Sequence, residues 1–159
     1  MQPSLNTWAV LLLFAAAQGL FLAPVLFTHR RGNRRANRVL AALIFLFALR
    51  LMETVGYWTK YLRDFPHFWL STASFSFLFG PLLHFYAKSL TTENLKFQKK
   101  EAGHFLPFLL YLAWLIPFYR LAREIKLGIL EKYIAVENPE MEWRYFLLFL
   151  LQIFHMLFY

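Results

Sequence analysis

The sequence contains no cysteine in its 159 residues, so neither a disulfide framework nor thiolate chemistry is open to it. Charged residues make up only 16% of the chain, and the segment from Met1 to Thr28 has no Lys, Arg, Asp or Glu. It also lacks a glycine-rich phosphate loop, a Gly-x-Ser-x-Gly elbow and a His-Glu-x-x-His motif. With no recognised catalytic signature, we expect a protein that is not an enzyme and that uses no metal and no cofactor.

What the chain has in excess is apolar and aromatic side chains. It is 59% hydrophobic and 20% aromatic, whereas soluble domains are about 45–50% apolar. A soluble core of this size has no room for so much apolar surface, which indicates a lipid environment. The net charge of +8 would suit nucleic acid, but the basic residues lie in short gaps between apolar stretches. We therefore interpret them as topology signals that face the anionic inner leaflet.

The apolar stretches predict an all-α fold, a polytopic transmembrane helix bundle that forms a single domain over residues 1–159. A helix of about 20 apolar residues crosses a bilayer, and shorter helices need interfacial anchors. We expect five spans and a soluble outer segment at 121–142, with the spans at about 6–28, 39–62, 67–88, 105–119 and 143–159.

Basic residues in the gaps predict the orientation. The gaps after the first and third spans carry the strongest positive charge, and such gaps remain in the cytoplasm. The N-terminus is then outside, and the C-terminus is cytoplasmic. The residues that carry this signal are Arg30, Arg31, Arg34, Arg35, Arg38, Lys96, Lys99 and Lys100.

Within the outer segment, Leu121, Ile125 and Gly128–Ile129 recur at helical spacing. This pattern predicts a short amphipathic helix on the outer surface, ended by Asn138-Pro139. Two roles remain open for it: a connector that floats on the head groups, or a segment that contacts a ligand.

Small residues at every fourth position indicate close helix packing in lipid. The pattern occurs twice, first as Ala15, Gly19 and Ala23 and then as Thr72, Ser76 and Gly80. Pro81 follows Gly80 directly, and we expect it to kink the third span because proline lacks a backbone N–H.

The second span carries a polar face at Arg50, Glu53 and Tyr57. Residues three apart are neighbours on a helix, so Arg50 and Glu53 can pair. A charge inside a membrane is costly, by roughly 2.5–3.5 kcal/mol on insertion scales, and it is by default a functional candidate. Two interpretations remain open: a structural ion pair that fixes helix rotation, and a site that binds a ligand or relays a signal.

Histidines form a weaker set of candidates. His84 lies one turn beyond Pro81 and could sense protons or bind a ligand, although a histidine hydrogen-bonded inside the bundle is the more ordinary interpretation. His84, His104 and His155 show no recognised metal-ligand spacing, so we expect no metal site there.

Several motifs occur in a recognisable order. They are GNRRANR at Gly32–Arg38, Pro66-His67, FGPLLHFY at Phe79–Tyr86, HFLPFLL at His104–Leu110 and PFY at Pro117–Tyr119. In order and spacing they resemble the N-terminal membrane region of AraC-type transcriptional regulators of Bacteroidetes-like bacteria. The resemblance covers most of the chain. It implies about seven spans followed by a cytoplasmic domain with paired helix-turn-helix units, so the sequence ends before the DNA-binding part.

The resemblance implies a membrane-embedded region that receives a small-molecule or envelope signal. DNA would then be contacted only through the missing C-terminal domain, and a homodimer is possible because AraC-type readers often act in pairs. Two alternatives remain: a small transporter or other integral membrane protein of unrelated role, and a truncated, inactive fragment. A transporter is disfavoured because no inverted repeat with matched broken spans is evident.

Overall fold

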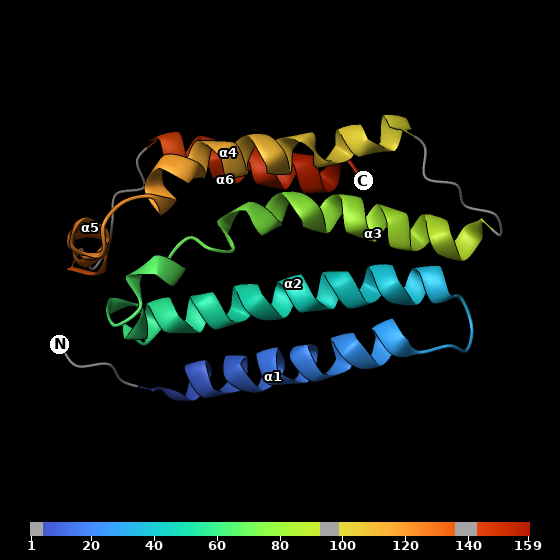
Figure 1. Ribbon diagram of the computed structural model, residues 1–159, viewed down its shortest axis with the longest axis horizontal. Helices are drawn as coiled ribbons and strands as arrows, with labels where there is room; N and C mark the ends of the chain where they lie inside the picture. The colour runs from blue at the N-terminus through green and yellow to red at the C-terminus, as the bar shows by residue number, and fades with distance from the viewer. Residues whose placement is uncertain (1–4, 93–98, 136–142) are drawn as a thin grey trace.

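The structure is a computed structural model that describes residues 5–92, 99–135 and 143–159. The described residues are helical or in turns and include no strand, which confirms the all-α prediction. In these three ranges, six α-helices are joined by short 3₁₀ turns and loops (Figure 1). The α-helices are α1 (Thr7–Thr28), α2 (Arg34–Trp58), α3 (Ser76–Thr91), α4 (Leu106–Tyr119), α5 (Arg123–Ala135) and α6 (Trp143–Leu157); the 3₁₀ turns are η1 (Tyr61–Arg63), η2 (Pro66–Phe68), η3 (Ala73–Phe75) and η4 (Lys99–Phe105).

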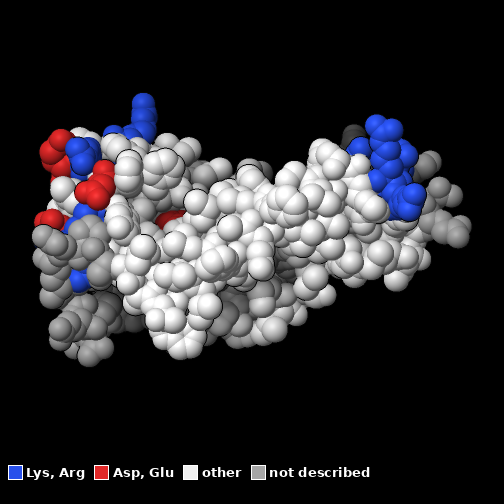
Figure 2. All heavy atoms as spheres, turned by 90° about the horizontal axis from the view of Figure 1, so that it is seen from below, with Lys and Arg blue, Asp and Glu red and all other residues white. Residues whose placement is uncertain are grey.

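Within the described ranges, four helical stretches are long and apolar enough to cross a membrane. They are Thr7–Thr28, Arg34–Trp58, Pro66–Thr91 and Glu101–Tyr119, while the apolar part of α6, Phe146–Leu157, is shorter. These helices run along the long axis of the molecule, and α5 lies across one end of the bundle (Figure 1). On the face drawn in Figure 2, charged atoms gather at the two ends and leave an uncharged band between them.

The second helix begins earlier than the sequence predicted, at Arg34 instead of residue 39. Asn33 is the reason, because its side-chain oxygen accepts hydrogen bonds from the backbone N–H groups of Arg35 and Ala36, both at 3.1 Å. An asparagine at this position satisfies amides that have no partner within the helix. Arg34, Arg35 and Arg38 therefore belong to the first turns of α2.

The third stretch differs more from its prediction. We expected one helix over 67–88, but residues 66–75 form two 3₁₀ turns and the regular helix begins only at Ser76. Leu70 lies in this interval with a left-handed φ of 62°. Such a backbone conformation is uncommon for a bulky side chain and costs about 1–3 kcal/mol.

Helices α1 and α2 pack through small residues that recur every seven positions. Ala9, Ala16 and Ala23 are buried on α1, and their counterparts on α2 are Ala41, Ala48 and Val55. A Cβ added at Gly19 would lie 2.9 Å from the Cβ of Ala48, so the two backbones approach closely there. Ala15, predicted for this interface, is exposed. The buried alanines of α1 are therefore spaced seven residues apart, whereas the sequence predicted small residues four apart.

Small residues also allow α6 to approach α3. Gly80 is buried, and a Cβ built on it would lie 2.7 Å from Cδ2 of Tyr159 and 3.2 Å from Cα of Met156. Pro81 lies beside it inside α3 and is buried as well, whereas Ser76 is half-buried. The end of the described chain thus packs directly against the third helix.

Helix α5 covers the end of the bundle opposite the arginine-rich loop. Its buried side chains are Lys126 and Leu130, and Leu130 packs with Leu62 and Trp69 in an apolar cluster. The buried face of α5 is not the one that the sequence predicted, because Ile125, expected on the apolar face, is 53% exposed. The helix itself lies where the sequence predicted one, and Asn138-Pro139 falls outside the described residues.

Replacing Gly19 by leucine should force α1 away from α2, because the new Cβ alone lies within 3 Å of Ala48. Overpacking of this kind costs about 1–3 kcal/mol. We expect a lower thermal unfolding midpoint of the detergent-purified protein, followed by circular dichroism. Ala17→Leu is the matched control, because Ala17 is exposed on the same helix. Equal midpoints for the two variants would contradict the interface.

Candidate functional site

The break in the third helical stretch creates a need for hydrogen-bond partners. Pro66 has no backbone N–H and opens η2, and Leu70 turns the chain out of helical geometry. Backbone amides that leave a helix inside an apolar region must find another acceptor, at a cost of several kcal/mol if they do not. The amide of Thr72 is one of them, and its acceptor comes from α2.

That acceptor is the carboxylate of Glu53. One of its oxygens, Oε2, accepts a hydrogen bond of 2.8 Å from the backbone N–H of Thr72 and a second one from the Thr72 hydroxyl. The same oxygen lies 3.7 Å from Nη1 of Arg50, which also donates to the Thr72 hydroxyl over 3.4 Å. The side chain of Glu53 is 7% exposed and that of Arg50 is 40% exposed. A desolvated carboxylate is thereby held by one cation and two donors.

Next to this polar cluster lies an apolar groove of about 560 Å³ between α2 and the broken stretch. Glu53 contributes the charged group of its lining, and hydroxyl groups come from Tyr61, Ser71 and Thr72. The other lining residues are apolar and include Met52, Phe65, Phe68 and Phe75. Grooves of this size with few polar groups are common sites for small ligands. The geometry suits a molecule with an apolar body and one cationic or hydrogen-bond-donating group.

A series of hydrogen bonds connects the cluster with α5. The Tyr119 hydroxyl, at the end of α4, donates to the carbonyl of Leu70 over 2.8 Å. The ammonium group of Lys126 donates to the carbonyl of Tyr119 over 2.9 Å and lies 3.0 Å from Nδ1 of His67. It also lies 5.4 Å from the centre of the Phe118 ring. Helix α5 is therefore attached to the same broken stretch that holds Thr72.

Lys126 is a buried cation on a surface helix, with 1% of its surface exposed. Burial disfavours the charged ammonium and lowers the pKa of Lys126 from its ordinary value. Its contacts are a carbonyl, an imidazole nitrogen and an aromatic face, all of which are neutral acceptors for a cation. None of these groups within the described part of the chain is a carboxylate, so they compensate the ammonium charge only in part.

The remaining predicted site residues lie elsewhere. Tyr57 packs against the apolar cluster of Leu62, Trp69 and Leu130, at the end of α2. His84 lies toward the other end, with its ring 5.7 Å from that of Tyr159. Tyr57 and His84 thus belong to separate parts of the bundle.

Three histidines gather around Tyr159. The Tyr159 hydroxyl lies 2.7 Å from Nδ1 of His104, and the Tyr159 ring lies 5.3 Å from that of His155. Neither ring nitrogen of His155 has a hydrogen-bond partner among the described residues. Within the part of the chain that the structure describes, no group of three potential ligands has the arrangement of a metal site. These contacts supply aromatic packing and one hydrogen bond, between Tyr159 and His104.

Sequence reasoning missed Thr72 as a partner of Glu53, because it read Thr72 only as a small packing residue. Phe65-Pro66 was the available signal, since a proline at that point favours a break and an extended preceding residue. Lys126 gave no signal at all, because a lysine beside Glu124 and Glu131 looks like an ordinary solvated charge.

Comparison of the chain with protein family models, with curated proteins and with solved structures finds no match. Function is therefore inferred from the residues and their geometry.

Replacing Lys126 by methionine should remove a pH dependence of stability. Because burial lowers the pKa of Lys126 below 10.5, the unfolded chain binds more protons than the folded one between the lowered pKa and 10.5. Stability therefore rises with pH across that interval and reaches its full value only above it. We expect the thermal midpoint in detergent to rise, as the pH approaches 10.5 from below, more in the wild type than in K126M.

Lys132→Met is the control for this experiment, because Lys132 is exposed on the same helix. K132M should keep the slope of the wild type. If the thermal midpoint of K126M changes with pH as steeply as those of the wild type and K132M, Lys126 does not titrate in a buried environment.

Proposed function

We propose that this chain is the membrane-embedded signal-input region of an AraC-type transcriptional regulator. In this proposal a ligand enters the groove beside Glu53 and Thr72 and competes for their hydrogen bonds. The loss of those bonds shifts the packing of the broken stretch against α2, and the shift reaches a cytoplasmic DNA-binding domain of the complete regulator.

The observation that carries the proposal is the connected polar cluster beside an apolar groove. Glu53 holds the backbone of Thr72 while Leu70 is held by Tyr119, so one short segment has partners on both α2 and α4. The broken stretch contains a left-handed residue and 3₁₀ turns, and hydrogen bonds hold it from two sides. Such a stretch is suited to adopt a second conformation when one of these hydrogen bonds is lost. A ligand can shift the equilibrium between the two conformations only by as much as its affinities for them differ.

The transcriptional part of the proposal rests on the order of the motifs from GNRRANR to PFY and on their likeness to AraC-type regulators. The proposed localisation is the bacterial inner membrane. The charge distribution supports the proposed orientation, because the five arginines of the loop after α1 and the first turns of α2 lie at the end opposite the mixed charges of α5.

The function is tested by Thr72→Val, expressed from the natural reading frame in the native host. Valine keeps the shape of threonine but removes the hydroxyl that bonds to Glu53, a loss of about 1.5–3 kcal/mol for a bond to a charged group. We expect expression of the target genes to change by about tenfold while the amount of protein in the membrane is unchanged. Transcript sequencing and quantitative immunoblotting measure the two. Glu53→Gln and Arg50→Leu should act in the same direction.

Thr54→Val is the control, because the Thr54 hydroxyl bonds to the carbonyl of Arg50 within its own helix. It should leave transcription unchanged. If T72V, E53Q and R50L all leave the transcripts at wild-type levels, the cluster has no part in signalling.

Orientation is tested separately with reporter fusions. A fluorescent protein that folds only in the cytoplasm should be active when inserted at Gly32 and inactive when inserted at Gly128, and alkaline phosphatase should give the reverse pattern. Both glycines are exposed, and a Cβ at either would meet no atom within 4 Å. A phosphatase signal at Gly32 would overturn the proposed topology.

A further inference from the structure

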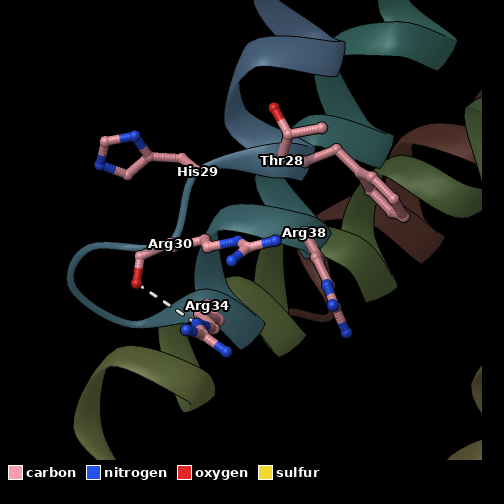
Figure 3. A pocket seen from close by; sticks show the side chains of 6 residues that line it. Thr28, His29, Arg30, Arg34 and Arg38 are labelled. Atoms are coloured by element: carbon pink, nitrogen blue, oxygen red, sulfur yellow. Dashed lines mark hydrogen bonds between the residues drawn. The ribbon is translucent and has the colours of Figure 1, made fainter.

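Three of the five arginines in the loop after α1 and the first turns of α2 line one hollow. Arg30, Arg34 and Arg38 follow at every fourth position, and together with Phe27, Thr28 and His29 they surround a space of about 520 Å³. Figure 3 shows the three arginine side chains on one side of the α1–α2 connection, with His29 directed away from them. Nε of Arg34 donates to the carbonyl of Arg30 over 3.3 Å, which holds the loop against the first turn of α2.

The hollow concentrates positive charge, and no carboxylate among the described residues forms an ion pair with the arginines that line it. The sequence from Met1 to Met52 contains no Asp or Glu. Between described residues, the ion pairs are Arg50–Glu53 and Lys88–Glu101, and neither includes Arg30, Arg34 or Arg38. Three guanidinium groups around one space repel one another, so an anion bound there is stabilised by all three. Guanidinium groups form paired hydrogen bonds with phosphate oxygens, which makes phosphate the best-fitting anion.

The surroundings of the hollow indicate where the anion comes from. Its wall includes Phe27, which is 58% exposed, and the Arg38 guanidinium lies 5.6 Å from the centre of the Phe27 ring. Phe27 belongs to the last turn of α1. Other exposed side chains of this helix include Phe21 and Val25. A ligand with its phosphate among the arginines can therefore lay an apolar chain along the outside of α1.

We infer that this hollow is a binding site for the phosphate head group of an anionic phospholipid. This site is distinct from a topology signal, to which all five arginines would contribute. Only Arg30, Arg34 and Arg38 line the space, whereas Arg31 and Arg35 do not. The site is independent of signalling through Glu53, so either proposal can fail alone.

The test uses the whole chain purified in a neutral detergent, where membrane orientation has no influence. Native mass spectrometry counts bound phosphatidic acid and bound phosphatidylcholine with identical acyl chains. The variants R30Q/R34Q and R31Q/R35Q form a matched pair, since each removes one loop arginine and one arginine from the first turn of α2. We expect the wild type to bind phosphatidic acid in preference, R30Q/R34Q to bind it about tenfold more weakly, and R31Q/R35Q to change less than about twofold.

Three results would overturn the assignment. Equal losses in both variants would show diffuse attraction to the whole arginine run, and equal binding of the two lipids by the wild type would show that the phosphate charge is not recognised. Displacement of phosphatidic acid by glycerol 3-phosphate at equal concentration would assign the hollow to a soluble phosphate ester. If R30Q/R34Q does not fold, R30K/R34K replaces it: lysine keeps the charge but not the paired hydrogen bonds, so weaker binding supports the site and unchanged binding contradicts it.

Discussion

The backbone amide of Thr72 sets the constraint on which the rest of this structure depends. A helix satisfies its own amides, but the stretch from Pro66 to Phe75 gives up that arrangement between two apolar helices. The freed amide takes its acceptor from Glu53, and the carboxylate in turn draws Arg50 and the Thr72 hydroxyl around it. A charge that would be expensive in apolar surroundings is acceptable here because it satisfies a backbone group that would otherwise have no partner.

The same break explains why α5 is attached to the bundle. Leu70 presents its carbonyl outside helical geometry, and the Tyr119 hydroxyl satisfies it. This places the end of α4 beside Trp69, where Phe118 and Leu130 complete an apolar cluster. Lys126 then fills the space between α5 and the broken stretch, with its ammonium on Tyr119 and His67. Packing of the apolar cluster stabilises the docked helix and offsets the burial of its lysine.

Hydropathy alone predicted the helical class and most apolar stretches, because lipid-compatible helices must be long and uninterrupted by charge. The pairing of Arg50 with Glu53 followed from their spacing of three. The sequence could not predict which face of α1 meets α2, since alanines occur at both Ala15 and Ala16 and only Ala16 is buried. Nor could it place Thr72 opposite Glu53, because that contact depends on how a non-helical segment folds back. Long-range geometry of this kind leaves no local pattern in the chain.

Within the proposed mechanism, the direction of a ligand's effect follows from what Glu53 does without it. The carboxylate stabilises the broken arrangement by accepting the Thr72 amide, so a cationic ligand group that draws the carboxylate into the groove leaves that amide without a partner. The segment then gains by returning toward helical geometry, which also relieves the left-handed conformation of Leu70. Such a change shortens the stretch and pulls on Tyr119 through the Leu70 carbonyl. In this mechanism, the residues that respond to the ligand are also those with the strained backbone. A ligand that replaces one hydrogen-bond partner, the Thr72 amide on Glu53, therefore alters the contacts of the segment with both α2 and α4.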